Sequence, residues 1–494
     1  MKRIIAILMM AALMLSMVAC GGGKISYQDA KDNNQLTEPP KTDDQGNVVV
    51  GNFAVPSVGY DGSEVTIKFA HTMGQKLTEA LDIHIARFNE LYPNITIEHD
   101  SYGGWEDIAK LINEESTAGN HPDIAYCYPD HVAQYRQSWI AVTLDELIKS
   151  EIEVTRADGS KEILGLTQEQ IDDFIPGFYS EGQVYGDGLM YTLPMSKSTE
   201  VLYYNKTFFE ANNLTVPTTW EEMEAVCRQI KALDPKSIPL GYDSENNMFI
   251  TLCEQYGYDY TSATGDEKFL FNNDGAKSFA KELREWHQDG LLTTEALYGA
   301  YTSGLFTELD KSISHSYMCI GSSGGASYQI PDNKAFEVGV ASVPQVDPAN
   351  PKVISQGPSL CLLKDQTDGS DQKVVASWLF MKFLTTDLLF QTDFSSRSGY
   401  MPVIKSAQEN ETYANWLNKA NGYEFLTAMT VKKGLEASDA YFTSPAFIGS
   451  SLAREQVGYL LAKCMSETTT DVDKFISDAF DATYKTCNQK AGKT

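Results

Sequence analysis

The stretch Tyr191-Thr-Leu-Pro-Met-Ser-Lys-Ser-Thr-Glu-Val-Leu-Tyr-Tyr-Asn-Lys206 decides the fold of this chain. The β-branched and aromatic run Val201–Tyr204 has the composition of a strand that is buried on both faces. Asn205 is placed to start a helix in which Phe208 and Phe209 face inward. The stretch therefore predicts a strand, a crossing segment, a second strand and then helices.

A β-α-β unit is predicted well before this stretch. Glu64–Ala70 and Ile95–Glu98 have the alternation of strands, and apolar residues recur between them at helical spacing. Such a unit is right-handed and builds a largely parallel sheet. Because open parallel sheets bind ligands beyond the carboxyl ends of their strands, three loops are candidate binding segments: His71–Gly74, Tyr102–Trp105 and Tyr128–Asp130.

The length of the chain predicts more than one core. Roughly 430 residues follow position 63, which is too many for one ordinary hydrophobic core. Strands and helices alternate over much of this length, which is typical of the α/β class. We therefore expect two α/β domains or lobes.

The N-terminus has the features of an export signal. Lys2 and Arg3 precede an apolar run, 4–15, that is too short to span a membrane. Met17-Val-Ala-Cys20 resembles a bacterial lipobox, which implies cleavage after residue 19 and lipidation of Cys20. Residues 20–63 contain few large apolar residues, so we expect the lipidated cysteine to be followed by a flexible tether. The alternative is an ordinary cleaved signal peptide.

Charge and cysteine content exclude several classes of function. The net charge of −28 argues against binding to nucleic acid or to anionic membrane surfaces. Beyond Cys20 the chain has seven cysteines, an odd number without metal-binding spacing. Most lie in apolar runs, where a cysteine behaves as a small buried hydrophobe. We predict neither a metal nor a cofactor.

One motif formally matches a hydrolase. Gly321-Ser-Ser-Gly-Gly325 satisfies G-x-S-x-G and follows a predicted strand. That fold needs its histidine later in the chain, and all seven histidines precede Ser323. No zinc-protease, nucleotide-binding or dinucleotide-binding motif is present. The sequence therefore predicts no enzyme, and a surface hydrolase is a remote alternative.

Several segments together resemble the family 1 extracellular solute-binding proteins of ABC importers. These are the block from Leu193 to Trp220, with "LP", "VLYYNK" and "P.TW.E", the segments "FNELYPNITIE" and "HPDIAY", and the turn Ser398–Val403. The resemblance spans about residues 64–487. It implies a periplasmic-binding-protein-like α/β fold, with two lobes of mostly parallel sheets joined by a multi-crossing hinge at 196–200. It also implies a monomer that hands a solute to a membrane permease.

The resemblance implies an assignment of segments to lobes. Lobe 1 is expected to contain 64–197 and about 314–363, because the strand at 314–320 returns towards it. Lobe 2 is expected to contain about 201–313 and 364–494. The implied location is outside the cytoplasm, on the outer face of the cell membrane, where lipidated Cys20 holds the protein.

Within this family the chain most resembles the glycerol-3-phosphate-binding subgroup. The subgroup's phosphate-clamping arginine is expected within 444–453, where this chain has none before Arg454, and Phe447 takes its place. Carried over residue by residue, the implied ligand-binding residues are Trp105, Asp130, Ser198, Ser322, Ser323, Gly357, Tyr400 and Phe447.

The missing arginine favours a neutral solute. A phosphate in a closed cleft needs charge-assisted donors, whereas the C–H face of a sugar packs on aromatic rings. Tyr128 and Trp286 are further candidate platforms. We therefore predict a carbohydrate, of oligosaccharide size. Glycerol-3-phosphate or a glycerophosphodiester is the alternative, because Arg397 or a helix N-terminus offers another place for an anion.

Overall fold

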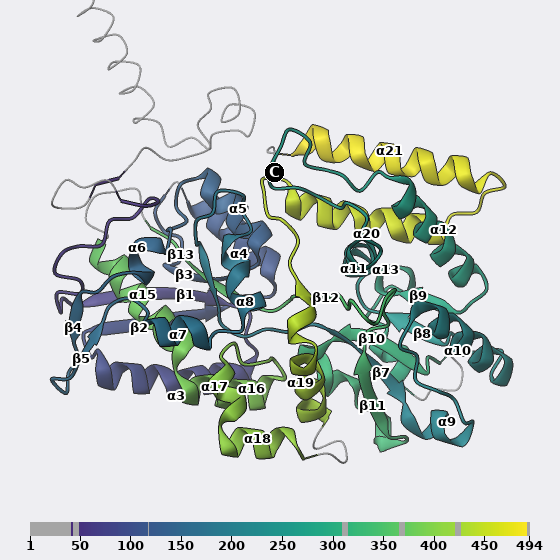
Figure 1. Cartoon of the computed structure of the whole chain (residues 1–494), viewed down its shortest axis with the longest axis horizontal. Helices are drawn as coiled ribbons and strands as arrows, with labels where there is room; N and C mark the ends of the chain where they lie inside the picture. Colours follow the sequence, from purple (N-terminus) through teal and green to yellow (C-terminus); the bar gives the residue numbers. More distant parts are fainter. Residues whose placement is uncertain are drawn as a thin grey trace, which may run out of the picture.

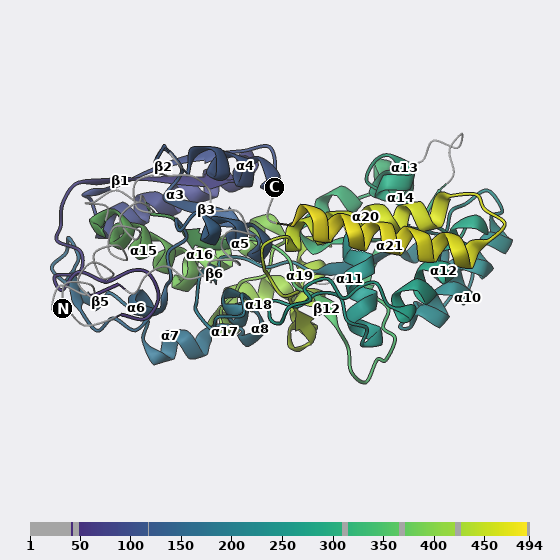
Figure 2. The same cartoon turned by 90° about the horizontal axis from the view of Figure 1, so that it is seen from above.

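The computed structural model describes residues 41–42, 49–116, 118–308, 315–364, 371–419 and 426–491. Two five-stranded sheets, each with its own helices, lie side by side along the longest axis of the molecule (Figure 1). We call the body that contains β1 lobe 1 and the body that contains β7 lobe 2. The view from above shows the same two bodies with α19 (Leu426–Glu436) between them (Figure 2). The predicted lipobox lies outside the described residues.

The sheet of lobe 1 begins with the predicted β-α-β unit. β1 (Val65–His71), α3 (Gln75–Leu91) and β2 (Ile95–Ser101) follow each other, and the two strands pair in parallel. The complete strand order is β2-β1-β3-β13-β6. β13 runs antiparallel to both of its neighbours, so the sheet is mixed. The other three strands are β3 (Ile124–Cys127), β6 (Thr192–Pro194) and β13 (Ser359–Leu362).

Helices from distant parts of the chain cover this sheet. Eleven of the sixteen residues of α15 are buried, and the helix packs against β1. The main helices of the lobe are α4 (Trp105–Glu115), α5 (Pro129–Gln137), α15 (Asp371–Thr386) and α16 (Leu388–Ser398). The smaller elements are α6 (Asp145–Ile148), β4 (Glu153–Thr155), β5 (Lys161–Ile163), α7 (Gln168–Asp173), α8 (Pro176–Ser180), η1 (Glu181–Gln183), α17 (Lys405–Glu409) and α18 (Glu411–Leu417).

The sheet of lobe 2 has the order β11-β7-β10-β8-β9. β7, the predicted strand after the crossing, lies between β11 and β10 and is antiparallel to both, whereas β10, β8 and β9 are parallel. This sheet is therefore mixed as well. Its strands are β7 (Glu200–Asn205), β8 (Leu240–Tyr242), β9 (Leu292–Thr294), β10 (Met318–Ser322) and β11 (Val338–Ser342).

Side-chain caps start several helices of lobe 2. Thr219 caps α10 in a reciprocal capping box with Glu222, and Asn205 caps α9 through the backbone N–H of Phe208. Of the two residues predicted to face inward, Phe209 is buried and Phe208 is half-buried against the same core. The elements are α9 (Lys206–Ala211), α10 (Trp220–Leu233), α11 (Glu245–Tyr256), α12 (Asp274–Gln288), α13 (Glu295–Tyr298), α14 (Ser303–Thr307), η2 (Ser323–Gln329), η3 (Asp332–Lys334), α20 (Ser450–Ser466) and α21 (Val472–Lys490).

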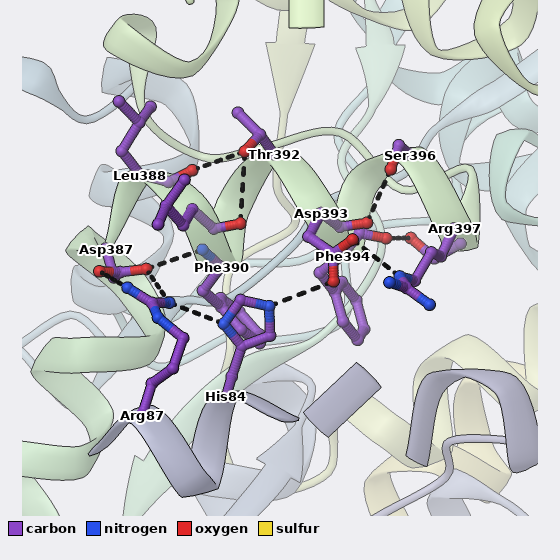
Figure 3. Close-up of polar contacts among 12 residues, drawn as sticks. His84, Arg87, Asp387, Leu388, Phe390, Thr392, Asp393, Phe394, Ser396 and Arg397 are labelled. Atoms are coloured by element: carbon purple, nitrogen blue, oxygen red, sulfur yellow. Dashed lines mark hydrogen bonds and ion pairs between the residues drawn. The ribbon is translucent and has the colours of Figure 1, made fainter. Parts of the chain in front are cut away.

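The structure corrects the predicted assignment of segments to lobes. β10 and β11 lie within 314–363, yet both pair with β7 in lobe 2. α15 and α16 lie beyond residue 364, yet both pack in lobe 1. Figure 3 shows what holds α16 there: Arg87 of α3 pairs with Asp387, and His84 bonds Asp393. Only β13, of the strands in the predicted returning segment, joins the first sheet.

Four chain segments meet between the lobes and form a small ladder, which we call the hinge. Lys197 pairs with Met401, and the neighbouring Ser198 pairs with Gln356. β12 (Val353–Ile354) then pairs in parallel with β14 (Tyr441–Phe442). A sheet-like hinge pairs backbone groups of all four segments. The segment around Met401 stays in lobe 1, where it joins α16 to α17, and the other three segments pass between the lobes.

Two further predictions concern cysteines and membranes. The seven cysteines at 127, 227, 253, 319, 361, 464 and 487 are buried free thiols, as predicted for small hydrophobes. Among the described residues no single helix has the length and apolarity to cross a membrane. α15 and α16 have sufficient length and apolarity only when they are taken together, and the chain bends by 65° between them.

Candidate functional site

Three aromatic rings gather at the carboxyl end of β3, as the sheet topology predicts for a binding edge. Trp105, the first residue of α4, stacks on Tyr126 with ring centroids 5.5 Å apart and planes 15° apart. Its ring centroid lies 4.6 Å from that of Tyr128. The Tyr126 hydroxyl is buried and has no hydrogen-bond partner among the described residues. This lobe 1 edge therefore combines an aromatic surface with an unused polar group.

Tyr400 lies where lobe 1 meets lobe 2. It follows α16, and the C-terminal glycine cap of that helix, Gly399, has a φ of +80°. A Cβ added at Gly324, in η2 of lobe 2, would lie 3.0 Å from the Tyr400 ring, so no larger residue fits there without displacing it. Burial raises the pKa of Tyr400, so its hydroxyl is neutral and able to donate at neutral pH.

An ion pair connects the two lobes beside these rings. Arg454 of α20 donates from Nε to Asp130 of α5 over 3.3 Å and from Nη1 to the side-chain oxygen of Asn247 over 2.6 Å. Asn247 in turn donates to Glu200 over 3.2 Å. The Asp130 side chain is 11% exposed and that of Arg454 is 29% exposed, so the pair is partly shielded from water.

Glu200 is a buried carboxyl group at the start of β7. It accepts hydrogen bonds from Tyr242 Oη at 2.5 Å and from Asn247. Burial raises the pKa of Glu200 to about 7, although both hydrogen bonds act to lower it. Glu200 is therefore partly protonated near neutral pH. It accepts a hydrogen bond from Asn247, the residue that also binds Arg454.

The predicted polar contacts lie in the hinge and at its border with lobe 2. Ser198 is buried in the first crossing, and its backbone exchanges two 2.9 Å hydrogen bonds with Gln356. Ser323 is fully buried, and its Oγ accepts from the backbone N–H of Thr199. Ser322 Oγ accepts from Gly324. Gly357 has a φ of +91°, and its carbonyl accepts from Lys197 Nζ at 3.4 Å.

The remaining candidates lie elsewhere. Phe447 is buried in the core of lobe 2, edge-on to Phe269 at 5.5 Å between ring centroids. Trp286 is buried in the same core. Arg397 pairs with Asp393 on its own helix, on the α3–α16 side of lobe 1 (Figure 3). The structure therefore brings together seven of the eight predicted residues, namely Trp105, Asp130, Ser198, Ser322, Ser323, Gly357 and Tyr400.

Sequence reasoning missed Arg454 and Tyr126. Arg454 lies one residue beyond the segment 444–453 in which the family resemblance places an arginine, in the second turn of α20. The contact of Arg454 with Asp130 could not be predicted, because no local sequence feature shows that α20 starts at the lobe junction. Tyr126 lies in the apolar run of β3, where the neighbouring cysteine favoured a purely structural role. The one sequence feature that could have indicated Tyr126 is its place near the carboxyl end of a buried strand.

A separate hollow of about 650 Å³ opens in lobe 2. It lies between the segment 257–275 and α21, and its lining includes Tyr258, Glu267 and Tyr484. All of its lining residues belong to lobe 2, and none is a predicted site residue. The junction between the lobes therefore remains the candidate site.

Comparison with known proteins identifies the family. Residues 84–421 match the family model described as bacterial extracellular solute-binding protein. The sn-glycerol-3-phosphate-binding periplasmic protein of Salmonella typhimurium is 23% identical over 390 residues, which cover 74% of this chain and 81% of that protein. A protein of the same name from Escherichia coli O1:K1 is equally similar.

Solved structures share the fold. The cyclic α-maltosyl-1,6-maltose binding protein of Arthrobacter globiformis has a TM-score of 0.67 at 18% identity, over 87% of this chain and all of that chain. UgpB of Mycobacterium tuberculosis in complex with glycerophosphocholine has a TM-score of 0.66 at 16% identity, over 86% of this chain and 98% of that one. These likenesses confirm the predicted two-lobed solute-binding fold.

Proposed function

Because the chain belongs to the bacterial extracellular solute-binding protein family, we propose that it captures a carbohydrate of oligosaccharide size between its two lobes. It then delivers the sugar to a membrane permease of an ABC importer. Lipidated Cys20 tethers the protein to the outer face of the membrane, close to that permease. The fold likeness to the Arthrobacter protein, which is named for a cyclic maltooligosaccharide, supports this solute class.

The observation that carries the proposal is the aromatic surface at the lobe junction. Trp105, Tyr126 and Tyr128 lie together on lobe 1, and Tyr400 lies against Gly324 of lobe 2. Sugar rings pack their C–H faces on such rings while their hydroxyls bond nearby polar groups. Tyr126 Oη and Ser196 Oγ, both buried, have no partner among the described residues. Such groups are suited to the hydroxyls of a sugar.

The charges at the junction also favour a neutral solute. Arg454 is already compensated by Asp130, so a phosphate would have to replace an existing ion pair before it gained the guanidinium. Three further carboxyl groups, Asp243, Glu245 and Glu295, follow strands β8 and β9 of lobe 2. A sugar needs no rearrangement of charge.

The two-lobed architecture explains how binding is signalled. An open and a closed form differ in the angle between the lobes, and a solute that contacts both lobes favours the closed form by its differential affinity. The closed complex then docks on the permease, and the solute leaves unchanged. Ser323, the serine of the G-x-S-x-G motif, is fully buried and exchanges two hydrogen bonds with Thr199. A serine in this position supports a binding role without catalysis.

A glycerophosphodiester is a second candidate solute, favoured by the position of Arg454. This is the one guanidinium that the described residues bring to the aromatic cluster, and it bonds across the junction. The Mycobacterium tuberculosis structure holds glycerophosphocholine, and the Salmonella protein is named for sn-glycerol-3-phosphate. In this reading the phosphate displaces Asp130 from Arg454.

A thermal-shift panel tests the proposal. The panel contains maltose, maltotriose, a cyclic maltooligosaccharide, glycerol-3-phosphate and glycerophosphocholine. A solute at 100 times its Kd adds about 2.7 kcal/mol to the free energy of unfolding. We expect a saccharide to raise Tm and to be recovered intact afterwards. Stabilisation by the phosphate compounds alone would replace the carbohydrate proposal with the second candidate, and cleaved saccharide would contradict a binding role.

A further inference from the structure

The hinge contains a buried ion pair that is not part of the proposed aromatic binding surface. Lys197, in the first crossing, is 0% exposed, and Glu181 of η1 is 2% exposed. Lys197 Nζ donates to Glu181, to Ser359 Oγ over 2.9 Å and to the carbonyl of Gly357 over 3.4 Å. All three ammonium hydrogens are therefore directed at hinge or lobe 1 acceptors.

Glu181 collects donors from the other hinge segments. Its Oε2 accepts from Ser355 at 3.0 Å and from Thr443 at 3.2 Å, and its Oε1 accepts from Ser359 at 2.9 Å. Ser355 belongs to the second crossing, between β12 and β13, and Thr443 follows β14. One carboxylate thus joins three of the four hinge segments, and Lys197 joins the fourth through the backbone pairing with Met401.

The backbones around this pair have almost no free space. A Cβ at Gly357 would lie 2.8 Å from both the Ser196 carbonyl and the Ser198 nitrogen, and 2.9 Å from Lys197 Cα. The crossings that carry Ser198 and Gly357 are therefore packed backbone against backbone at Lys197. An apolar side chain would fill the same space without the cost of desolvating two charges.

We propose that the Lys197–Glu181 pair is a positioning device that fixes how the hinge segments lie against each other, and so sets the resting angle between the lobes. Lys197 and Glu181 act through Ser198, Gly357 and Tyr400, whose places depend on the hinge. The consequence for solute affinity rests on the proposed function. The effect on the ligand-free lobe angle does not.

Lobe 1 offers a matched control. Lys382 of α15 is 5% exposed, and its Nζ donates to Glu162 over 2.9 Å and to the carbonyl of Ile163 over 2.6 Å. This second lysine–glutamate pair, in which the Glu162 side chain is 18% exposed, lies entirely within lobe 1. Removing it should reduce stability but leave the angle between the lobes unchanged.

The test is the distribution of distances between spin labels at Ile83→Cys on α3 and Leu233→Cys on α10, measured without solute. Both positions are about half exposed, one in each lobe, and the natural thiols in the described residues are buried. Lys197→Met is compared with wild type, and the double variant Lys197→Met/Glu181→Gln serves if Lys197→Met does not fold. Lys382→Met and Lys382→Met/Glu162→Gln are the controls.

We expect the hinge variants to shift or broaden the distribution by more than its wild-type width, while the lobe 1 controls match wild type. A hinge double variant whose distribution superimposes on that of wild type overturns the proposal, as do controls that shift equally. Because no solute is present, a failed carbohydrate assignment leaves this result interpretable. If maltotriose binds wild type, its Kd should change on the order of tenfold in the hinge variants only.

Discussion

The two ion pairs near the lobe junction differ in what surrounds them. In the hinge, Lys197 and Glu181 are fully buried and every polar atom has partners from neighbouring segments. At the proposed solute site, the side chain of Arg454 is 29% exposed and that of Asp130 is 11% exposed, and Arg454 acts electrostatically on Tyr128. In the same aromatic cluster the Tyr126 hydroxyl has no partner among the described residues. The hinge is complete without a solute, whereas the site is not.

This difference separates two roles that a two-lobed binding protein needs. A saturated, buried network allows few alternative arrangements and defines a mechanical pivot. A site with unused donors and acceptors gains them when a solute arrives, so the free energy of binding is available to favour closure. The following variants either break this contrast or measure it.

The largest effect is expected from breaking the hinge pair. Lys197→Met leaves the Glu181 carboxylate buried without its charge partner, which costs about 3–5 kcal/mol of unfolding free energy. Urea denaturation measures it. Lys197→Met/Glu181→Gln should recover part of the loss because the buried charge is gone. If Lys197→Met is as stable as wild type, the hinge ion pair contributes no more to the free energy of unfolding than a surface ion pair does.

The second effect concerns Glu200, which links the site to lobe 2. Its folded-state pKa of about 7 lies above its unfolded value near 4.5, so the folded state binds more protons between these pH values. Stability from Glu200 is therefore present below about pH 4.5 and is lost as pH rises to about 7. Relative to Glu200→Gln, wild type should gain about 2 kcal/mol between pH 7 and pH 5.

The control for this titration is Glu98→Gln, because Glu98 is exposed on β2. Glu98→Gln makes the same chemical change at an exposed position and leaves the contacts of Glu200 intact. A wild-type advantage over Glu200→Gln that stays flat across this range would place Glu200 in a more solvated environment than its burial indicates.

A third effect tests the aromatic surface. Trp105→Ala or Tyr400→Ala should weaken saccharide binding at least tenfold, about 1.4 kcal/mol, because each removes a ring from the surface on which the sugar packs. Calorimetric titration measures the Kd, and circular dichroism checks that both variants fold. Phe447→Leu is the matched comparison, since Phe447 lies in the lobe 2 core. Unchanged affinity in both alanine variants would remove these rings from the site.

The smallest effect on stability is expected at the interlobe pair. Asp130→Asn should change the unfolding free energy by about 1 kcal/mol or less, because Arg454 is 29% exposed and keeps its hydrogen bond to Asn247. It should nevertheless change selectivity, since Arg454 loses its compensating charge and becomes available to an anion. Glycerophosphocholine binding should strengthen relative to saccharide binding in Asp130→Asn. An unchanged ratio would mean that Arg454 does not face the solute.

Local features of the fold were predictable from sequence. The β1-α3-β2 unit, the helix start at Asn205 and the crossing before β7 could each be predicted from nearby residues. The lobe to which a later segment returns was not predictable, because strand pairing depends on partners far away in sequence. Nothing around Met318 shows that β10 pairs with β7, and nothing around Asp387 shows that α16 is held by Arg87, 300 residues earlier.

The site was predictable where family motifs mark it and obscure elsewhere. Trp105, Ser198 and Tyr400 were found because they follow motifs whose place at the lobe junction the resemblance supplies. Arg454 was missed because its reach across the junction depends on where α20 begins, and Phe447 was placed in the site although its ring faces the lobe 2 core. Whether these residues contact a solute remains a prediction.

The most direct test of a solute held between two moving lobes is small-angle X-ray scattering of the saccharide-bound and saccharide-free protein. The saccharide used is the one whose binding calorimetry has established. We predict that its addition reduces the radius of gyration in wild type and not in Trp105→Ala at the same concentration. Scattering curves that stay identical while calorimetry records saturable heat would contradict closure around the solute.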